Sequence, residues 1–320
     1  MAGDCALAAI TSSCVITAFR FKLDSMDELD AIFDKYLQNP FRDHFETLDE
    51  LNPFATQFYI DVAEIYDCLT RVRNKERDPT GYTVADAPII GLLVRIWKLL
   101  KETIHYYTEN NAEFLAIFHR TLIETAVTAT YLLKHDAAVL EDYRKCSYKD
   151  RLRILQDAKN GSAFSKTKAG KRLLRSVEEK MSLEGFSEND FAEQKKHRWK
   201  LQGKSFFQIF TSIYDEKMYT HAFGMSSESV HCSWNDSMDW CLQRNEDGTF
   251  SIYPFYHSAD IRFITPLLLF CNDPFALWLK RISPDDEYFR HFAMFLDWIE
   301  VQNHHLYREF DRLYGDTTPA

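Results

Sequence analysis

Glycine and proline are scarce in this sequence, at 10 and 9 of 320 residues. A turn-rich β-sandwich or a disordered chain would contain many more of both. Hydrophobic residues make up 46% of the chain and aromatic residues 15%, which is enough to bury one large core or two smaller ones. The composition therefore predicts a globular protein that is rich in α-helix.

The cysteines are few, odd in number and scattered. There are seven, and no two of them form a Cys-x-x-Cys pair (Cys5, Cys14, Cys68, Cys146, Cys232, Cys241 and Cys271). A disulfide framework needs an even number of cysteines, and a cysteine-rich zinc site needs closely spaced pairs. We therefore expect reduced thiols in a cytoplasmic protein.

A targeting signal and a long uninterrupted hydrophobic segment are also missing. No basic stretch precedes the apolar residues 5–18, as it would in a secretory signal. The apolar run 261–279 is interrupted by two prolines, Asn272 and Asp273. We expect neither secretion nor a membrane span.

The signature motifs of several large enzyme classes are absent. The sequence contains no G-x-x-x-x-G-K-[ST], G-x-G-x-x-G, G-x-S-x-G or H-E-x-x-H. P-loop kinases, Rossmann oxidoreductases, α/β-hydrolases and zincins depend on these motifs for phosphate binding, nucleophile placement or metal ligation. We therefore expect no cofactor.

Charge is unevenly distributed along the chain, whose net charge is −10. Residues 144–204 carry 17 Lys and Arg against 8 Asp and Glu, a net charge of +9, which leaves −19 for the rest of the chain. A basic segment of this kind is either a solvated helical surface or a surface that meets RNA, a nucleotide or an acidic protein.

Hydrophobic spacing predicts helices along most of the chain. The expected helices cover 26–36, 54–70, 89–107, 112–133, 206–231 with a possible break at Gly224, 261–279 and 288–313. A β-hairpin is expected around Gly248 within 240–254. We predict an all-α antiparallel helical bundle, in which 1–88 pack on a core of 89–320 and 144–204 form a basic helical insertion.

Arg120 and Glu124 interrupt an otherwise apolar stripe of the predicted helix 112–133. Their i, i+4 spacing places both side chains on one face. A buried ion pair that locks neighbouring helices is one interpretation. In the other, Arg120 binds an anion and Glu124 orients it.

His231 lies among small polar residues beside a large aromatic residue. A continuous helix would bring Ser227, Glu228, Trp234 and Asn235 onto the same side as His231. Tyr219, Ser226 and Ser233 are further candidate binding residues (Tyr219, Ser226, Glu228, Ser233, Trp234, Asn235). Because histidine titrates near neutral pH, the patch suits general acid–base chemistry, although a structural hydrogen bond is equally compatible with the pattern.

These elements resemble a known family. Arg120-x3-Glu124, followed far downstream by Val230-His231-x-Ser233-Trp234 and a short Asp-Gly hairpin, resembles an uncharacterised bacterial family known only as a domain of unknown function. Its members look like distant relatives of the helical HEPN superfamily. That resemblance implies metal-independent RNA cleavage in a homodimer, with His231 as general acid–base and Arg120 as the cation. The sequence departs from the HEPN pattern because Ser226, not arginine, stands five residues before His231.

Two other functions are compatible with the residues. In a non-catalytic interaction protein, His231 and its neighbours would hold helices together and residues 144–204 would bind an acidic protein partner. In a di-metal carboxylate protein, two Glu-x-x-His pairs and two further glutamates would bind the ions (Glu102 and His105, Glu228 and His231, Glu64, Glu124).

Overall fold

The computed structural model describes residues 24–38, 41–231, 233–283 and 287–317, and the statements below concern these residues. The elements of the bundle are α2 (Asp24–Gln38), α3 (Leu48–Arg71), α4 (Ala87–Thr108), α5 (Ala112–Leu133), η4 (Ile261–Phe263), α15 (Thr265–Ile282) and α16 (Glu287–Thr317). Helix α6 (Ala137–Cys146) leads into the insertion, which contains α7 (Lys149–Lys159), α8 (Ala163–Lys166), α9 (Lys168–Leu183), η1 (Glu188–Phe191), α10 (Ala192–Lys196) and η2 (Leu201–Gly203). The remaining elements are α11 (Phe206–Thr211), α12 (Glu216–Met218), η3 (Tyr219–Gly224), α13 (Met225–His231), α14 (Trp234–Trp240), β1 (Leu242–Arg244) and β2 (Phe250–Ile252).

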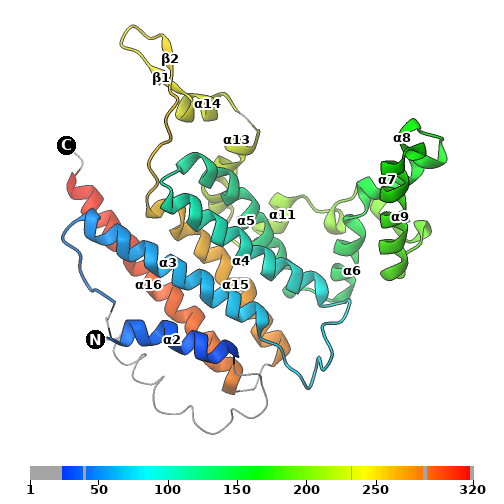
Figure 1. The fold of residues 1–320 in the computed structure, drawn as a ribbon, viewed down its shortest axis with the longest axis horizontal. Helices are drawn as coiled ribbons and strands as arrows, with labels where there is room; N and C mark the ends of the chain where they lie inside the picture. Colours follow the sequence, from blue (N-terminus) through cyan, green and yellow to red (C-terminus); the bar gives the residue numbers. More distant parts are fainter. Residues whose placement is uncertain (1–23, 39–40, 232, 284–286, 318–320) are drawn as a thin grey trace.

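Helix α5 lies at the centre of the bundle. It packs against α4, α15 and α13, while α3 packs on α4 and α16, and α2 packs on α3 (Figure 1). One hydrophobic core joins these helices, from Leu29 in α2 to Leu313 in α16. The predicted all-α antiparallel bundle with one short β-hairpin is confirmed.

Local sequence determines the turn between α4 and α5. Asn110 takes a positive φ of 56°, which asparagine tolerates better than most residues. The Asn111 side chain then accepts a hydrogen bond from the backbone N–H of Phe114 and caps α5. The predicted helix 112–133 matches α5 at both ends.

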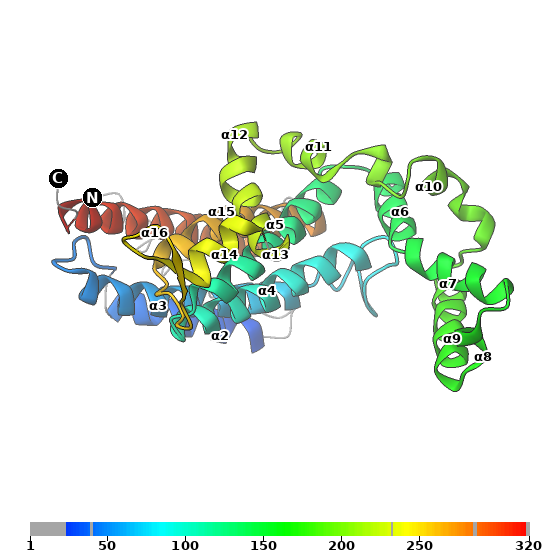
Figure 2. The same ribbon diagram turned by 90° about the horizontal axis from the view of Figure 1, so that it is seen from above.

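The insertion has a small core of its own. Six buried side chains form it (Tyr148, Leu152, Leu155, Val177, Met181 and Phe191). Figure 2 shows α7 to α9 standing to one side of the bundle, joined to it through α6 and the segment that leads to α11. Because the insertion buries its own apolar residues, its outer surface can be strongly charged without exposing the bundle core.

Residues 206–231 do not form one helix, contrary to the sequence prediction. Asp215 caps the short helix α12, so that α11 and α12 are separate. The segment η3 is a π-helix and leads directly into α13. Hydrophobic spacing alone cannot distinguish this arrangement from one continuous α-helix, because a π-helical turn inserts only a single residue into a 3.6-residue period.

Other predicted boundaries shift by a few residues. Helix α3 begins at Leu48, six residues before the predicted start, because Thr47 caps it by accepting a hydrogen bond from the N–H of Glu50. In the hairpin, Leu242 pairs with Ile252 and Gly248 has a φ of 84°. Residues 284–286, which precede the predicted helix 288–313, lie outside the described residues.

In the described part of the chain, no helix is both long enough and apolar enough to cross a membrane. Four of the cysteines lie in this part and are free (Cys68, Cys146, Cys241 and Cys271). Cys5, Cys14 and Cys232 are outside it.

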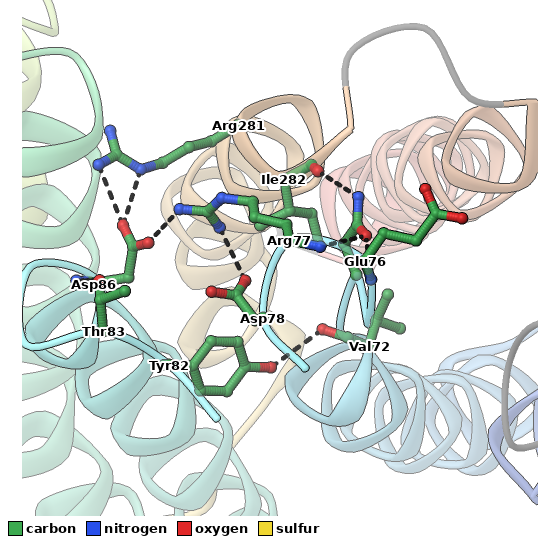
Figure 3. Close-up of polar contacts among 10 residues, drawn as sticks. Val72, Glu76, Arg77, Asp78, Tyr82, Thr83, Asp86, Arg281 and Ile282 are labelled. Atoms are coloured by element: carbon green, nitrogen blue, oxygen red, sulfur yellow. Dashed lines mark hydrogen bonds and ion pairs between the residues drawn. The ribbon is translucent and has the colours of Figure 1, made fainter. Parts of the chain in front are cut away.

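A buried ionic network fastens the connection between α3 and α4 to the end of α15 (Figure 3). Asp86 is 1% exposed and pairs with the guanidinium groups of Arg77 and Arg281, the latter at 3.0 Å. Arg77 also contacts Asp78 at 3.1 Å. Asn74 donates a hydrogen bond of 3.0 Å to the carbonyl of Ile282. The network balances two buried carboxylates with two guanidinium groups, as burial of charge requires.

Replacing Asp86 by alanine should lower the free energy of unfolding by about 2–3 kcal/mol. Loss of a buried ionic partner costs about 3–5 kcal/mol, and we reduce that figure because about a third of each arginine side chain is exposed. Urea denaturation measures the change. Asp43→Ala, at an exposed position, is the control and should stay within about 0.5 kcal/mol of the wild type. A change for Asp86→Ala no larger than the control's would contradict the structural role of the network.

Candidate functional site

The structure brings Arg120 and His231 together, although 111 residues separate them in the sequence. Nη1 of Arg120, from α5, lies 3.0 Å from Nε2 of His231, at the end of α13. Because arginine has no acceptor atom, Arg120 donates this hydrogen bond and Nε2 of His231 accepts it. His231 is exposed and Arg120 is half-buried, so a ligand in solvent can reach both.

The ring of Phe223 packs against the guanidinium group of Arg120. The guanidinium carbon of Arg120 lies 4.8 Å from the centre of the Phe223 ring, which is a cation–π geometry. Phe223 is buried and belongs to the π-helix η3. Such π-helical turns occur frequently at functional sites. Here the turn sets the position of Phe223 and of the helix α13 that follows.

Glu124 does not pair with Arg120. Its side chain is exposed, and the structure, which describes both residues, shows no ion pair between them. The prediction of a buried Arg120–Glu124 ion pair is therefore wrong. Instead Glu124 acts on Tyr143, whose pKa is raised by burial and, to a smaller extent, by the carboxylate of Glu124. Arg120 is left without a carboxylate partner among the described residues, so its positive charge remains open to an external anion.

Tyr219 and Ser226 support the site from within the fold. The Tyr219 ring packs against Phe207 and Phe210, and also against Phe223. The Ser226 hydroxyl is buried and donates to the carbonyl oxygen of Phe223, at 2.9 Å. Both residues therefore hold the π-helical turn in place.

Glu228 and Ser233 join α13 to α14. The Ser233 hydroxyl donates to the Glu228 carboxylate at 3.3 Å and accepts from the N–H of Asp236, which caps α14. Because α13 ends at His231, Trp234 and Asn235 belong to a different helix, and the prediction that one continuous helix carries them is wrong. Trp234 is exposed and packs edge-on against Phe250 of the hairpin, and Asn235 is exposed.

The glutamates and histidines that suggested a di-metal protein do not converge. In the part of the chain that the structure describes, no group of three or more His, Cys, Asp or Glu side chains is placed to bind a metal ion. Glu64, Glu102 and His105 are exposed on α3 and α4. The sequence spacing thus does not produce a carboxylate–imidazole site among the described residues.

Sequence reasoning overlooked His119, the neighbour of Arg120. Its ring faces Phe263 with 5.6 Å between ring centres, and its Nε2 is buried without a hydrogen-bond partner among the described residues. Burial lowers the pKa of His119 to about 4, and a hydrogen bond with the backbone of Phe263 opposes part of this shift. The rotation of α5 therefore turns His119 toward Phe263 and the next residue, Arg120, toward α13.

The fold and the pair together define an all-α helical-bundle protein that presents an arginine–histidine pair to solvent. Residues 86–249 match a family of unknown function (DUF5677). Because the match covers just over half of the 320 residues, the chain belongs to this family. The matched region begins at Asp86 and includes both Arg120 and His231. No similar protein was found among curated proteins, and none among solved structures.

The stability of the protein should depend on pH through His119. Its folded-state pKa of about 4 lies below the ordinary value of 6.5, so between these values the unfolded chain binds a proton that the folded chain does not. The contribution of His119 to the free energy of unfolding is therefore fully present above pH 6.5 and is lost as the pH falls toward 4. Urea denaturation at pH 7 and pH 5 should show the wild type losing about 2 kcal/mol more than His119→Gln. Equal losses in the two proteins would contradict the burial of this histidine.

Arg120 and His231 should contribute little to the free energy of unfolding. Phe223, which packs against Arg120, should contribute much. We expect Arg120→Ala and His231→Ala to change the free energy of unfolding by less than about 1 kcal/mol, because both side chains reach solvent. Phe223→Ala should cost about 3–5 kcal/mol, as for other buried phenylalanines. Thermal or urea denaturation of the three variants tests this ranking. A loss of several kcal/mol for His231→Ala would instead indicate a structural histidine.

Proposed function

We propose that this protein is a HEPN-like, metal-independent ribonuclease that binds RNA at Arg120 and His231. The observation that carries the proposal is the 3.0 Å contact between Nη1 of Arg120 and Nε2 of His231 on an accessible surface. A guanidinium beside an imidazole supplies two groups that cleavage of RNA requires, a cation for the phosphate and a base for the ribose hydroxyl.

The reaction uses the ribose 2′-hydroxyl as the nucleophile. His231 takes the 2′-hydroxyl proton through Nε2 while the 2′-oxygen forms a bond to phosphorus. The bond between phosphorus and the 5′-oxygen then breaks, and protonated His231 returns the proton to the departing oxygen. The products are a 2′,3′-cyclic phosphate and a 5′-hydroxyl, and no other reactant is needed.

Arg120 stabilises the charge that develops on the phosphate. A phosphate oxygen that enters the site takes the hydrogen bond that Arg120 donates to His231 in the free protein, and this frees Nε2 to accept the 2′-hydroxyl proton. Phe223 keeps the guanidinium in place during this exchange because its ring lies directly against it. The expected setting is the cytoplasm and the expected assembly is a homodimer.

A non-catalytic interaction protein is the second candidate, and the β-hairpin favours it. Ile252 is 81% exposed and Phe255 is 67% exposed, with the exposed Phe250 and Trp234 beside them. The hairpin projects from the bundle (Figure 1). Exposed apolar side chains that gather on one element often mark a protein-binding surface. In this case the hairpin would carry the function and the Arg120–His231 pair would not.

Cleavage of labelled single-stranded RNA in EDTA tests the proposal. We expect wild-type protein to cleave RNA, His231→Ala to lose about 10²- to 10⁴-fold in rate, and Arg120→Ala to lose about 10²- to 10³-fold. His304→Ala removes another exposed histidine, on α16, and should keep the wild-type rate. Detection of the cyclic phosphate product identifies the reaction.

Two results would overturn the proposal. The first is folded wild-type protein that cleaves no RNA over a panel of sequences. The second is cleavage that persists unchanged in His231→Ala, which would point to a contaminating nuclease. If the wild type is inactive while substitutions in the hairpin abolish binding of a partner, the interaction-protein candidate takes its place.

A further inference from the structure

Helix α9 has one apolar face and one basic face. Leu174, Val177 and Met181 turn toward the core of the insertion. The opposite face of its first two turns carries four exposed cations, and the structure shows no ion pair between any of them and a described residue (Lys168, Lys171, Arg172 and Arg175). No acidic residue lies in the first turn of α9. We call these four residues the α9 basic face.

The cations of the α9 basic face repel one another. Lys168 and Arg172 are four residues apart, as are Lys171 and Arg175, and like charges at this spacing destabilise a helix. The cations also lie near the N-terminal end of α9, where the helix dipole adds further positive potential. Three sources of repulsion therefore act on one short surface, and binding of an anionic partner would relieve all of them.

Some cations elsewhere in the insertion have acidic partners. Arg144 pairs with Glu184 at 2.9 Å, and Lys159 pairs with Glu188 at 2.5 Å. Lys196 pairs with Glu193 in the same way. The α9 basic face has no such ion pair among the described residues, so its four cations contribute directly to the excess positive charge of residues 144–204.

A short helix, α8, precedes α9 and packs against it. Its last residue, Lys166, is exposed and adds a cation just before α9 begins. Gly170 holds α8 close, because a Cβ atom at that position would lie 2.0 Å from the carbonyl oxygen of Phe164. Gly170 lies on the side of α9 away from the α9 basic face, so α8 leaves that face open to solvent.

The grooves of the insertion are less suited to an anionic partner. One cavity of about 280 Å³ is lined by Ile154, Asp157 and Phe164 among others, and a neighbouring one of about 580 Å³ is lined by Lys159, Glu178 and Glu188 among others. Carboxylates stand at both, and Lys159 is already paired with Glu188. An acidic peptide would meet like charge there, whereas at the α9 basic face the first carboxylates, Glu178 and Glu179, come three and four residues after Arg175.

We infer that the α9 basic face, with Lys166, is a binding surface for single-stranded RNA that is distinct from the Arg120–His231 pair. The inference rests on the proposed function only for the choice of RNA as the polyanion. The cations bind backbone phosphates without regard to sequence. The surface lies on the insertion, to one side of the bundle that holds the pair (Figure 2).

The salt dependence of RNA binding tests this inference. Full-length protein and the variant K168Q/K171Q/R172Q/R175Q are titrated with labelled single-stranded RNA at 50–200 mM KCl, with fluorescence anisotropy as the readout. For single strands, each phosphate contact contributes about 0.7 to the steepness of the plot of log K against log salt concentration. The variant lacks four cations, so its slope should be shallower than that of the wild type by about 3. Wild-type protein should accordingly lose about 50-fold more affinity than the variant between these salt concentrations.

A second variant controls for net charge. K75Q/K98Q/K101Q/K280Q removes the same four charges from exposed positions outside the insertion. It should keep a slope close to that of the wild type, and circular dichroism verifies that both variants remain folded. Equal slopes for the two variants would overturn the inference, because the effect would then come from overall charge.

The remaining outcomes separate this inference from the proposed ribonuclease activity. Retained binding with lost cleavage in His231→Ala supports both. Absence of cleavage in the wild type, with a slope that depends on the α9 basic face, supports the RNA-binding surface and removes the catalytic proposal. If polyglutamate competes for the face as strongly as RNA of equal charge, the inference is overturned in favour of an acidic protein partner.

Discussion

The burial of helix α5 is the constraint on which the rest of the structure depends. Packing against α4, α15 and α13 leaves α5 few permitted rotations about its axis. His119 turns toward Phe263, and the next residue, Arg120, consequently turns toward His231. The contact between Arg120 and His231 therefore follows from core packing and not from attraction between the two side chains, which alone would not hold an exposed pair.

The region that defines the family needs the rest of the chain. Residues 86–249 contain α4 and α5, but α3, which packs on α4, and α15, which packs on α5, lie outside that region, as does α16, which packs on α3 and α15. Asp86, the first matched residue, pairs with Arg281 at the end of α15. An ion pair thus links the beginning of the matched region to a helix that follows this region in the sequence. The geometry of the arginine–histidine pair therefore depends on residues inside and outside the matched region.

The sequence predicted what local periodicity controls. Helix α5 has the expected ends because Asn111 provides a cap and apolar residues recur at helical spacing. It failed at 206–231, where Asp215 caps a new helix and residues 219–224 form a π-helix, because hydrophobic spacing does not distinguish these from one α-helix. Helical spacing also paired Arg120 with Glu124, which lies four residues later on the same face of the helix. The actual partner of Arg120 is 111 residues away, and only tertiary packing brings that partner near.

Under the two proposals, charge segregation gives the two surfaces different parts in binding RNA. Outside residues 144–204 the chain has a net charge of −19, so a long RNA strand is repelled by most of the bundle. The insertion, at +9, attracts it. Arg120 is a single cation on this acidic background and cannot attract a strand from a distance, since exposed charges are screened over about 10 Å at 0.1 M salt. In a protein with both functions, the insertion therefore supplies affinity that depends on salt, and the pair supplies short-range orientation of one phosphate.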